Sequence, residues 1–120
     1  MGFVKVSAQI GATSASMQEI ELMVDTPTFY TFLPPSICDD LDLHLPLRET
    51  VTTADNRSFE IDAGVAHIKI NGREGATLVG RLDVPMPLLG VAALESLGYK
   101  VDPVRGVLEE TRPFPGSPAL

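Results

Sequence analysis

The chain has 120 residues, 44% of them hydrophobic and 21% charged, which suits one folded domain and excludes a disordered or membrane-embedded protein. Sixteen acidic residues against nine basic ones give a net charge of -7, which would repel a phosphate backbone or an anionic membrane surface. We therefore expect no nucleic-acid partner and no membrane partner. The first residues lack a signal-peptide pattern, and we expect a cytoplasmic protein.

Cysteine and histidine are too scarce for the common metal sites. The single cysteine, Cys38, excludes a disulfide within the chain and the thiol clusters of zinc and iron–sulfur centres. The two histidines, His44 and His67, lie far apart in the sequence with no ligand pattern near either. We expect no metal and no other cofactor. The favoured interpretation of Cys38 is a small, buried hydrophobic side chain.

The first part of the chain predicts three short strands and a helix. Residues 4–10 alternate apolar and polar side chains with a period of two, and residues 20–24 repeat the pattern after a small, polar turn. These two segments predict a hairpin. Residues 28–33 are rich in β-branched and aromatic side chains and predict a third strand. Two prolines then open a helix over residues 37–43, with Ser36 as its N-cap.

The second part of the chain predicts more hairpins. Residues 49–54 and 58–62 form one of them, and its projecting tip is the polar run Asp55-Asn56-Arg57. The remaining predicted elements are strands at residues 66–70, 76–82, 99–102 and 107–109, a turn at Asn71-Gly72, and a short helix at residues 91–97 that stops at Gly98.

Eight or so short strands and two short helices predict a mainly β fold, in the form of a small closed β-barrel. Residues 1–110 form this domain. Residues 111–120 contain three prolines, a glycine and a serine, and predict a flexible tail.

Two short motifs far apart in the chain carry the functional signal. Asp25 follows the apolar strand at residues 20–24 and is followed by Thr26, while Leu88-Leu89-Gly90 precedes the second helix. By local sequence alone, Asp25 is a turn-initiating residue at a strand end. Together with Phe32-Leu33-Pro34-Pro35, however, the two motifs resemble the retropepsin-like aspartic proteases.

The resemblance covers residues 3–110 and keeps the order of the elements. In that family an apolar strand delivers Asp-Thr-Gly, and an apolar-apolar-Gly segment near the C-terminus crosses behind it. The segments Leu94-Glu95-Ser96-Leu97-Gly98 and Val101-Asp102-Pro103 are similar to those of the single-domain prokaryotic members. The resemblance implies a barrel of the acid-protease type.

The resemblance also implies that the chain works as a homodimer. Two carboxylates held about 3 Å apart share one proton and activate a water between them. This chain offers one Asp-Thr pair and is too short for two lobes, so each subunit would supply one Asp25 on the two-fold axis. Thr26 would bond across that axis and support the pair. The activity implied is hydrolysis of a peptide or protein substrate.

Substrate contacts are implied at two places. Pro27 and Thr28 directly follow Asp25 and Thr26 in the sequence. The hairpin tip Ala54-Asp55-Asn56-Arg57 corresponds to the flap that closes on an extended peptide.

One departure from the family pattern leaves two hypotheses open. Pro27 stands where the family has a glycine whose N–H donates to the catalytic carboxylate, and proline has no N–H. Losing a donor to a buried charged group costs about 1–3 kcal/mol. Thr28 has an N–H and a hydroxyl that could replace it. The first hypothesis is an aspartic endopeptidase that tolerates Pro27. The second is a catalytically inactive dimer that serves as a peptide-binding or assembly module.

Overall fold

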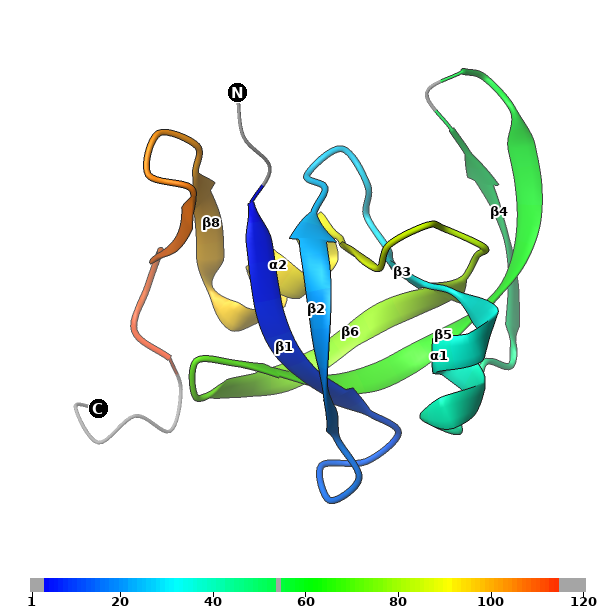
Figure 1. Ribbon diagram of the computed structural model, residues 1–120, viewed down its shortest axis with the longest axis horizontal. Helices are drawn as coiled ribbons and strands as arrows, with labels where there is room; N and C mark the ends of the chain where they lie inside the picture. Colours follow the sequence, from blue (N-terminus) through cyan, green and yellow to red (C-terminus); the bar gives the residue numbers. More distant parts are fainter. Residues whose placement is uncertain (1–3, 54, 115–120) are drawn as a thin grey trace.

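The computed structural model describes residues 4–53 and 55–114, and they form a mainly β structure (Figure 1). Seven strands share one sheet in the order β1-β2-β7-β3-β6-β5-β4. Because β1 also pairs with β5, the sheet curls back on itself, and β4 extends beyond the ring. The strands are β1 (Lys5–Gly11), β2 (Gln18–Val24), β3 (Thr31–Leu33), β4 (Leu47–Thr52), β5 (Ser58–Ile70), β6 (Arg73–Arg81) and β7 (Leu88–Leu89), with a separate hairpin of β8 (Tyr99–Asp102) and β9 (Val107–Glu110).

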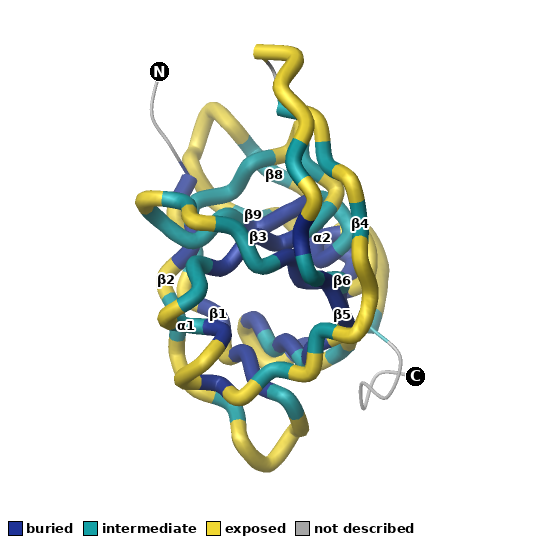
Figure 2. Tube along the Cα trace, turned by 90° about the vertical axis from the view of Figure 1, so that its right-hand side faces the viewer, coloured by how far each residue is buried: buried dark blue, intermediate teal, exposed yellow. Residues whose placement is uncertain are grey.

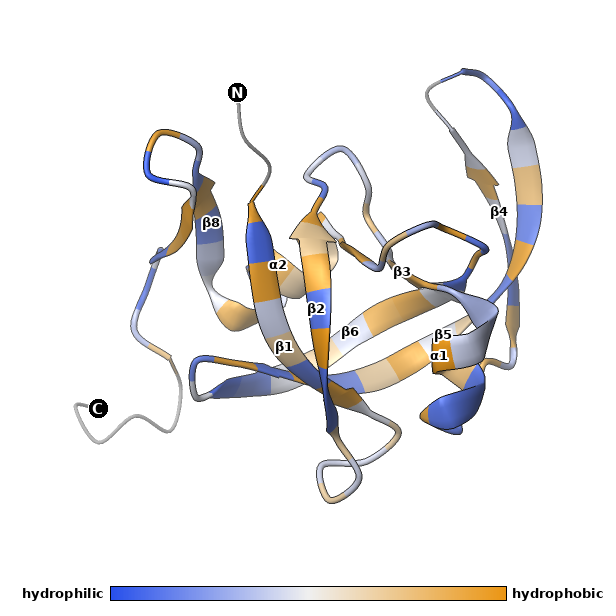
Figure 3. Ribbon diagram, viewed as in Figure 1, coloured by the Kyte–Doolittle hydropathy of each residue, from blue (hydrophilic) through white to orange (hydrophobic). Residues whose placement is uncertain are grey.

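The predicted first hairpin is confirmed. β1 and β2 pair antiparallel from Lys5 opposite Met23 to Ile10 opposite Gln18. Apolar and polar residues alternate along both strands (Figure 3), and the apolar residues are the more buried ones. Ile10 and Leu22 are completely buried as a result.

β5 differs from its prediction because it is one strand of 13 residues where the sequence predicts two. Its first half pairs with β4, and its second half pairs with β6. Gly64 lies where the partners change, and a Cβ there would come within 2.4 Å of the carbonyl oxygen of His44. The glycine is therefore a point of close backbone approach inside a continuous strand.

Local sequence signals predict α2 correctly but α1 only in part. α2 (Val91–Leu97) has the predicted bounds and ends at Gly98, which adopts the left-handed conformation at φ 73. α1 (Pro35–Asp40) starts two residues earlier and ends three residues earlier than predicted, with Pro35 in its first turn. Ser36 therefore lies inside the helix, and no side chain caps its start. The prediction of Ser36 as N-cap is wrong because proline itself fits the first helical position.

The core is formed by residues of the sheet strands and of the two helices, and Figure 2 shows the buried stretches along them. Its largest fully buried hydrophobic side chains come from six strands and both helices: Ile10, Leu22, Leu33, Cys38, Ile68, Ile70, Val79, Leu89, Leu94 and Leu97. Cys38 is buried as predicted, and burial raises the pKa of its thiol. Such a thiol is unreactive.

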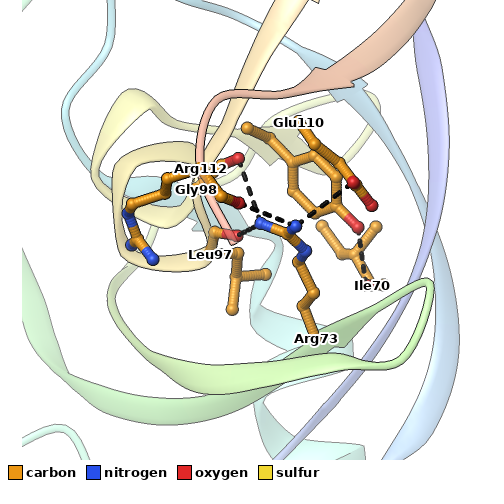
Figure 4. A network of polar contacts seen from close by, with 7 residues as sticks. Ile70, Arg73, Leu97, Gly98, Glu110 and Arg112 are labelled. Carbon is orange, nitrogen blue, oxygen red and sulfur yellow. Dashed lines mark hydrogen bonds and ion pairs between the residues drawn. The ribbon is translucent and has the colours of Figure 1, made fainter. Parts of the chain in front are cut away.

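A buried arginine holds the C-terminal part of the chain against α2 (Figure 4). Arg73 donates hydrogen bonds to the carbonyl oxygens of Leu97 at 3.0 Å, Gly98 at 3.3 Å and Arg112 at 2.9 Å. Phe114 packs partly buried against the core, and the Arg73 guanidinium lies 5.4 Å from its ring centre. Residues 111–114 of the predicted tail thus make specific contacts, and its remaining residues lie outside the described part.

Candidate active site

Asp25 lies at the end of β2, in a loop of residues 25–30 that we call the Asp25 loop. This loop connects β2 to β3, but β7 lies between those two strands in the sheet. Val24 pairs in parallel with Leu89, and Phe32 pairs antiparallel with Leu88. The loop must therefore arch over the end of β7. The prediction of a strand over residues 28–33 is wrong for its first half, because residues 28–30 belong to this arch.

Four hydrogen bonds join the Asp25 loop and Thr31 to the segment at Gly90. The Asp25 N–H donates to the Leu89 carbonyl at 2.9 Å. Beyond Gly90, the N–H groups of Val91 and Ala92 donate to carbonyls of the loop at 2.8 and 3.2 Å. The Gly90 N–H donates to the hydroxyl of Thr31 at 3.2 Å. The first turn of α2 and the Asp25 loop are thus one rigid unit.

Gly90 is required by this crossing. A Cβ at this position would lie 2.2 Å from the carbonyl oxygen of Tyr30 and 2.5 Å from that of Phe29. Both obstacles are backbone atoms, which cannot rotate away. Gly90 therefore allows the two backbones to approach closely behind the Asp25 loop.

Thr28 uses both of its donors on the main chain of Asp25. Its N–H and its hydroxyl donate to the Asp25 carbonyl oxygen at 3.1 and 2.8 Å, which closes a tight turn. In the described part of the chain, no hydrogen bond or ion pair ends on the carboxylate of Asp25. Thr28 therefore does not replace the donor that Pro27 lacks within one subunit.

The four residues of this turn differ in exposure. Asp25 and Thr28 are partly buried, whereas Thr26 and Pro27 are exposed. Thr26 also lines an open pocket of about 500 Å³ between α2 and β8. The other residues that line this pocket are Val91, Leu94, Glu95, Tyr99, Lys100, Val101 and Thr111.

The second predicted group of site residues lies at the tip of the β4–β5 hairpin. The N–H of Thr53 donates to the Arg57 carbonyl at 2.8 Å, and Asn56 adopts the left-handed conformation at φ 64. Asp55 accepts a bond from the Thr53 hydroxyl, and the Arg57 guanidinium lies 5.3 Å from the ring centre of Phe59. The predicted polar tip is confirmed, and Ala54 lies outside the described residues.

The tip and the Asp25 loop project from the same side of the molecule (Figure 1). A direct link joins their bases. The Tyr30 hydroxyl, on the Asp25 loop, donates to the Glu49 carboxylate on β4 at 2.6 Å. This hydrogen bond is the main cause that raises the pKa of Tyr30, and burial of the ring is the second cause. Sequence reasoning missed the pair because its members are far apart in the chain and belong to no motif.

Neither a metal site nor a related family is found for this chain within its described residues and its sequence. Among residues 4–53 and 55–114, no cluster of three or more histidine, cysteine or acidic side chains could hold a metal ion. No helix of the described chain has the length and apolar character needed to cross a membrane. No family model matches the sequence, and a search of curated proteins finds no match.

Proposed function

We propose that this chain is a homodimeric aspartic endopeptidase in which Asp25 of each subunit contributes one carboxylate to a catalytic pair. One observation carries the proposal. The Asp25 loop arches over Leu88-Leu89-Gly90, with the Asp25 N–H bonded to Leu89 and Gly90 against the carbonyls of the loop. This is the crossing that the resemblance to retropepsin-like proteases implies, and it holds the backbone of Asp25 rigidly.

The proposed chemistry follows from the repulsion between the two Asp25 carboxylates on the dimer axis. Two carboxylates at about 3 Å cannot both ionise, so the pair shares one proton. The ionised member takes a proton from a bound water as that water attacks the scissile carbonyl, and the protonated member stabilises the oxygen on which charge develops. A single chain supplies one such carboxylate, so activity requires the dimer.

Exposure of the neighbouring residues supports the dimer. Thr26 is exposed in the single chain and can bond across a two-fold axis. The pocket between α2 and β8 lies beside it, with apolar side chains such as Val91 and Val101 in its lining. We assign the sheet ring to the acid-protease type of barrel and the β4–β5 hairpin to its flap, with Pro27, Thr28 and the hairpin tip contacting the substrate. The single buried thiol supports a cytoplasmic location, and the charge of -7 argues against a nucleic-acid or anionic membrane partner.

A second function is favoured by Pro27. The carboxylate of Asp25 lacks the donor that a glycine N–H would provide, and both donors of Thr28 are used on a carbonyl. A dimer with the same fold could then bind a peptide under the hairpins without cutting it. This alternative is an inactive binding or assembly module.

Cleavage of a diverse peptide pool tests the proposal. The protein is incubated from about pH 3.5 to about pH 7, the range in which such pairs work, and products are read by mass spectrometry. Asp25→Asn should abolish cleavage, while Asp83→Asn, the same change at an exposed aspartate, should leave it intact. Cleavage that survives in Asp25→Asn contradicts the mechanism. Folded dimers that cut nothing at any of these pH values favour the binding module.

A further inference from the structure

The hairpin that we assign as the flap is long and mostly exposed. β4 forms an edge of the sheet, and within the described residues it pairs with β5 alone. Of its six residues, Leu47, Arg48, Thr50 and Thr52 are exposed. Few contacts hold such a hairpin in one orientation, so a single strong bond at its base has a large effect on its position.

Tyr30 has the features of an anchor for that bond. Its carbonyl oxygen lies against Gly90, where even a Cβ would not fit. Its ring makes edge contacts with Phe29 and Phe32, with centroids 5.7 and 6.0 Å apart. Phe32 is buried and belongs to β3. Tyr30 is therefore fixed at both its backbone and its ring, and only its hydroxyl extends away to the hairpin.

Glu49, on β4, accepts the hydrogen bond from the Tyr30 hydroxyl. It is partly buried on β4 and pairs with Ile61, a core residue of β5. Its carboxylate accepts the Tyr30 hydroxyl at 2.6 Å, which is the short distance of a charge-assisted bond. In residues 4–53 and 55–114, this is the one side-chain hydrogen bond that joins the Asp25 loop to the hairpin.

We propose that Tyr30 is a positioning residue, which fixes the β4–β5 hairpin relative to the loop that carries Asp25 through its hydrogen bond to Glu49. The consequence for substrate binding rests on the proposed function. If the hairpin covers the peptide, loosening its base weakens substrate binding more than it slows the chemical step. The effect of the Tyr30–Glu49 bond on the position of the hairpin does not depend on catalysis.

Hydrogen–deuterium exchange tests the coupling without any assay of activity. Tyr30→Phe removes the hydroxyl and keeps the ring. We expect the amides of residues 50–59 to exchange about fivefold to tenfold faster, while those of β1 and β2 stay unchanged. Glu49→Gln keeps an acceptor oxygen and should stay nearer to the wild-type rate than Glu49→Ala. Tyr99→Phe is the matched control, because it removes a hydroxyl bonded to Ile70, at the end of β5 away from the hairpin tip.

Two exchange results would overturn the proposal: no change at residues 50–59 in Tyr30→Phe, or an equal rise throughout the sheet. With a cleaved peptide in hand, Tyr30→Phe should raise KM several-fold and change kcat less than twofold. Faster exchange with an unchanged KM would refute the positioning role in substrate binding. If the wild-type protein cleaves nothing, the proposed function fails, and the exchange rates still decide whether the Tyr30–Glu49 bond fixes the hairpin.

Discussion

Replacing Arg73 with methionine should destabilise the fold by about 3 kcal/mol, the range of a broken buried charge network. The Arg73 side chain is 9% exposed, and it satisfies carbonyl oxygens at the end of α2 that no helical N–H can reach (Figure 4). Methionine keeps most of the aliphatic volume but provides no donors. The carbonyls of Leu97 and Arg112 then lose the Arg73 donor, whereas the carbonyl of Gly98 keeps the N–H of Thr111 at 2.8 Å.

The magnitude follows from the geometry. A hydrogen bond from a charged donor contributes about 1.5–3 kcal/mol net, and two of the three bonds, at 3.0 and 2.9 Å, have good length. Contacts with the rings of Tyr99 and Phe114, at 5.2 and 5.4 Å, add about 0.5–1 kcal/mol each. Removing a buried cation also relieves its desolvation, which offsets part of the sum. The ion pair with Glu110 adds little because that carboxylate is 66% exposed.

Urea denaturation measures this loss, with Arg48→Met as the matched control. Arg48 is 62% exposed and pairs with Asp62 and Glu60 on the surface, so its loss should cost less than about 1 kcal/mol. The midpoint should fall clearly for Arg73→Met at an unchanged slope. If both variants lose the same small amount of stability, the buried network does not stabilise the C-terminal segment.

Three further predictions concern the site and the tyrosines. Gly90→Ala should lower the free energy of unfolding by about 3 kcal/mol in urea denaturation, because its Cβ would meet backbone oxygens. Gly75→Ala is the control, since its Cβ would meet only the ends of side chains, and it should lower the free energy of unfolding by less than about 1 kcal/mol. Equal effects of the two variants would contradict the crossing geometry. Pro27→Gly should raise kcat/KM, by up to about a hundredfold, if the missing donor limits catalysis, and an unchanged value would refute that explanation. The pKa values of Tyr30 and Tyr99 are raised above 10.0, by the Glu49 bond and by burial respectively, so their contribution to stability is complete below pH 10 and is lost as pH rises through the folded values. Denaturation curves should therefore show a steeper alkaline loss in the wild type than in Tyr99→Phe, and identical losses would be evidence against it.

The sequence determined the elements whose signals are local. The bounds of α2 and its stop at Gly98 follow from a left-handed position that glycine favours. The turn at Asn71-Gly72 is confirmed for the same reason, with both residues at positive φ. Period-two alternation predicted β1 and β2. The short motifs also selected Asp25 and Gly90, and in the structure the backbone at Gly90 lies close to the carbonyls of the Asp25 loop.

Only the tertiary structure decided what depends on partners distant in sequence. β5 is continuous because two different strands pair with its two halves, and no local signal reports this. The Asp25 loop begins where β7 enters the sheet between β2 and β3, which shortens the predicted strand to Thr31–Leu33. The Tyr30–Glu49 and Arg73 bonds join residues 19 and more positions apart, so the folded chain alone brings their charges and donors together.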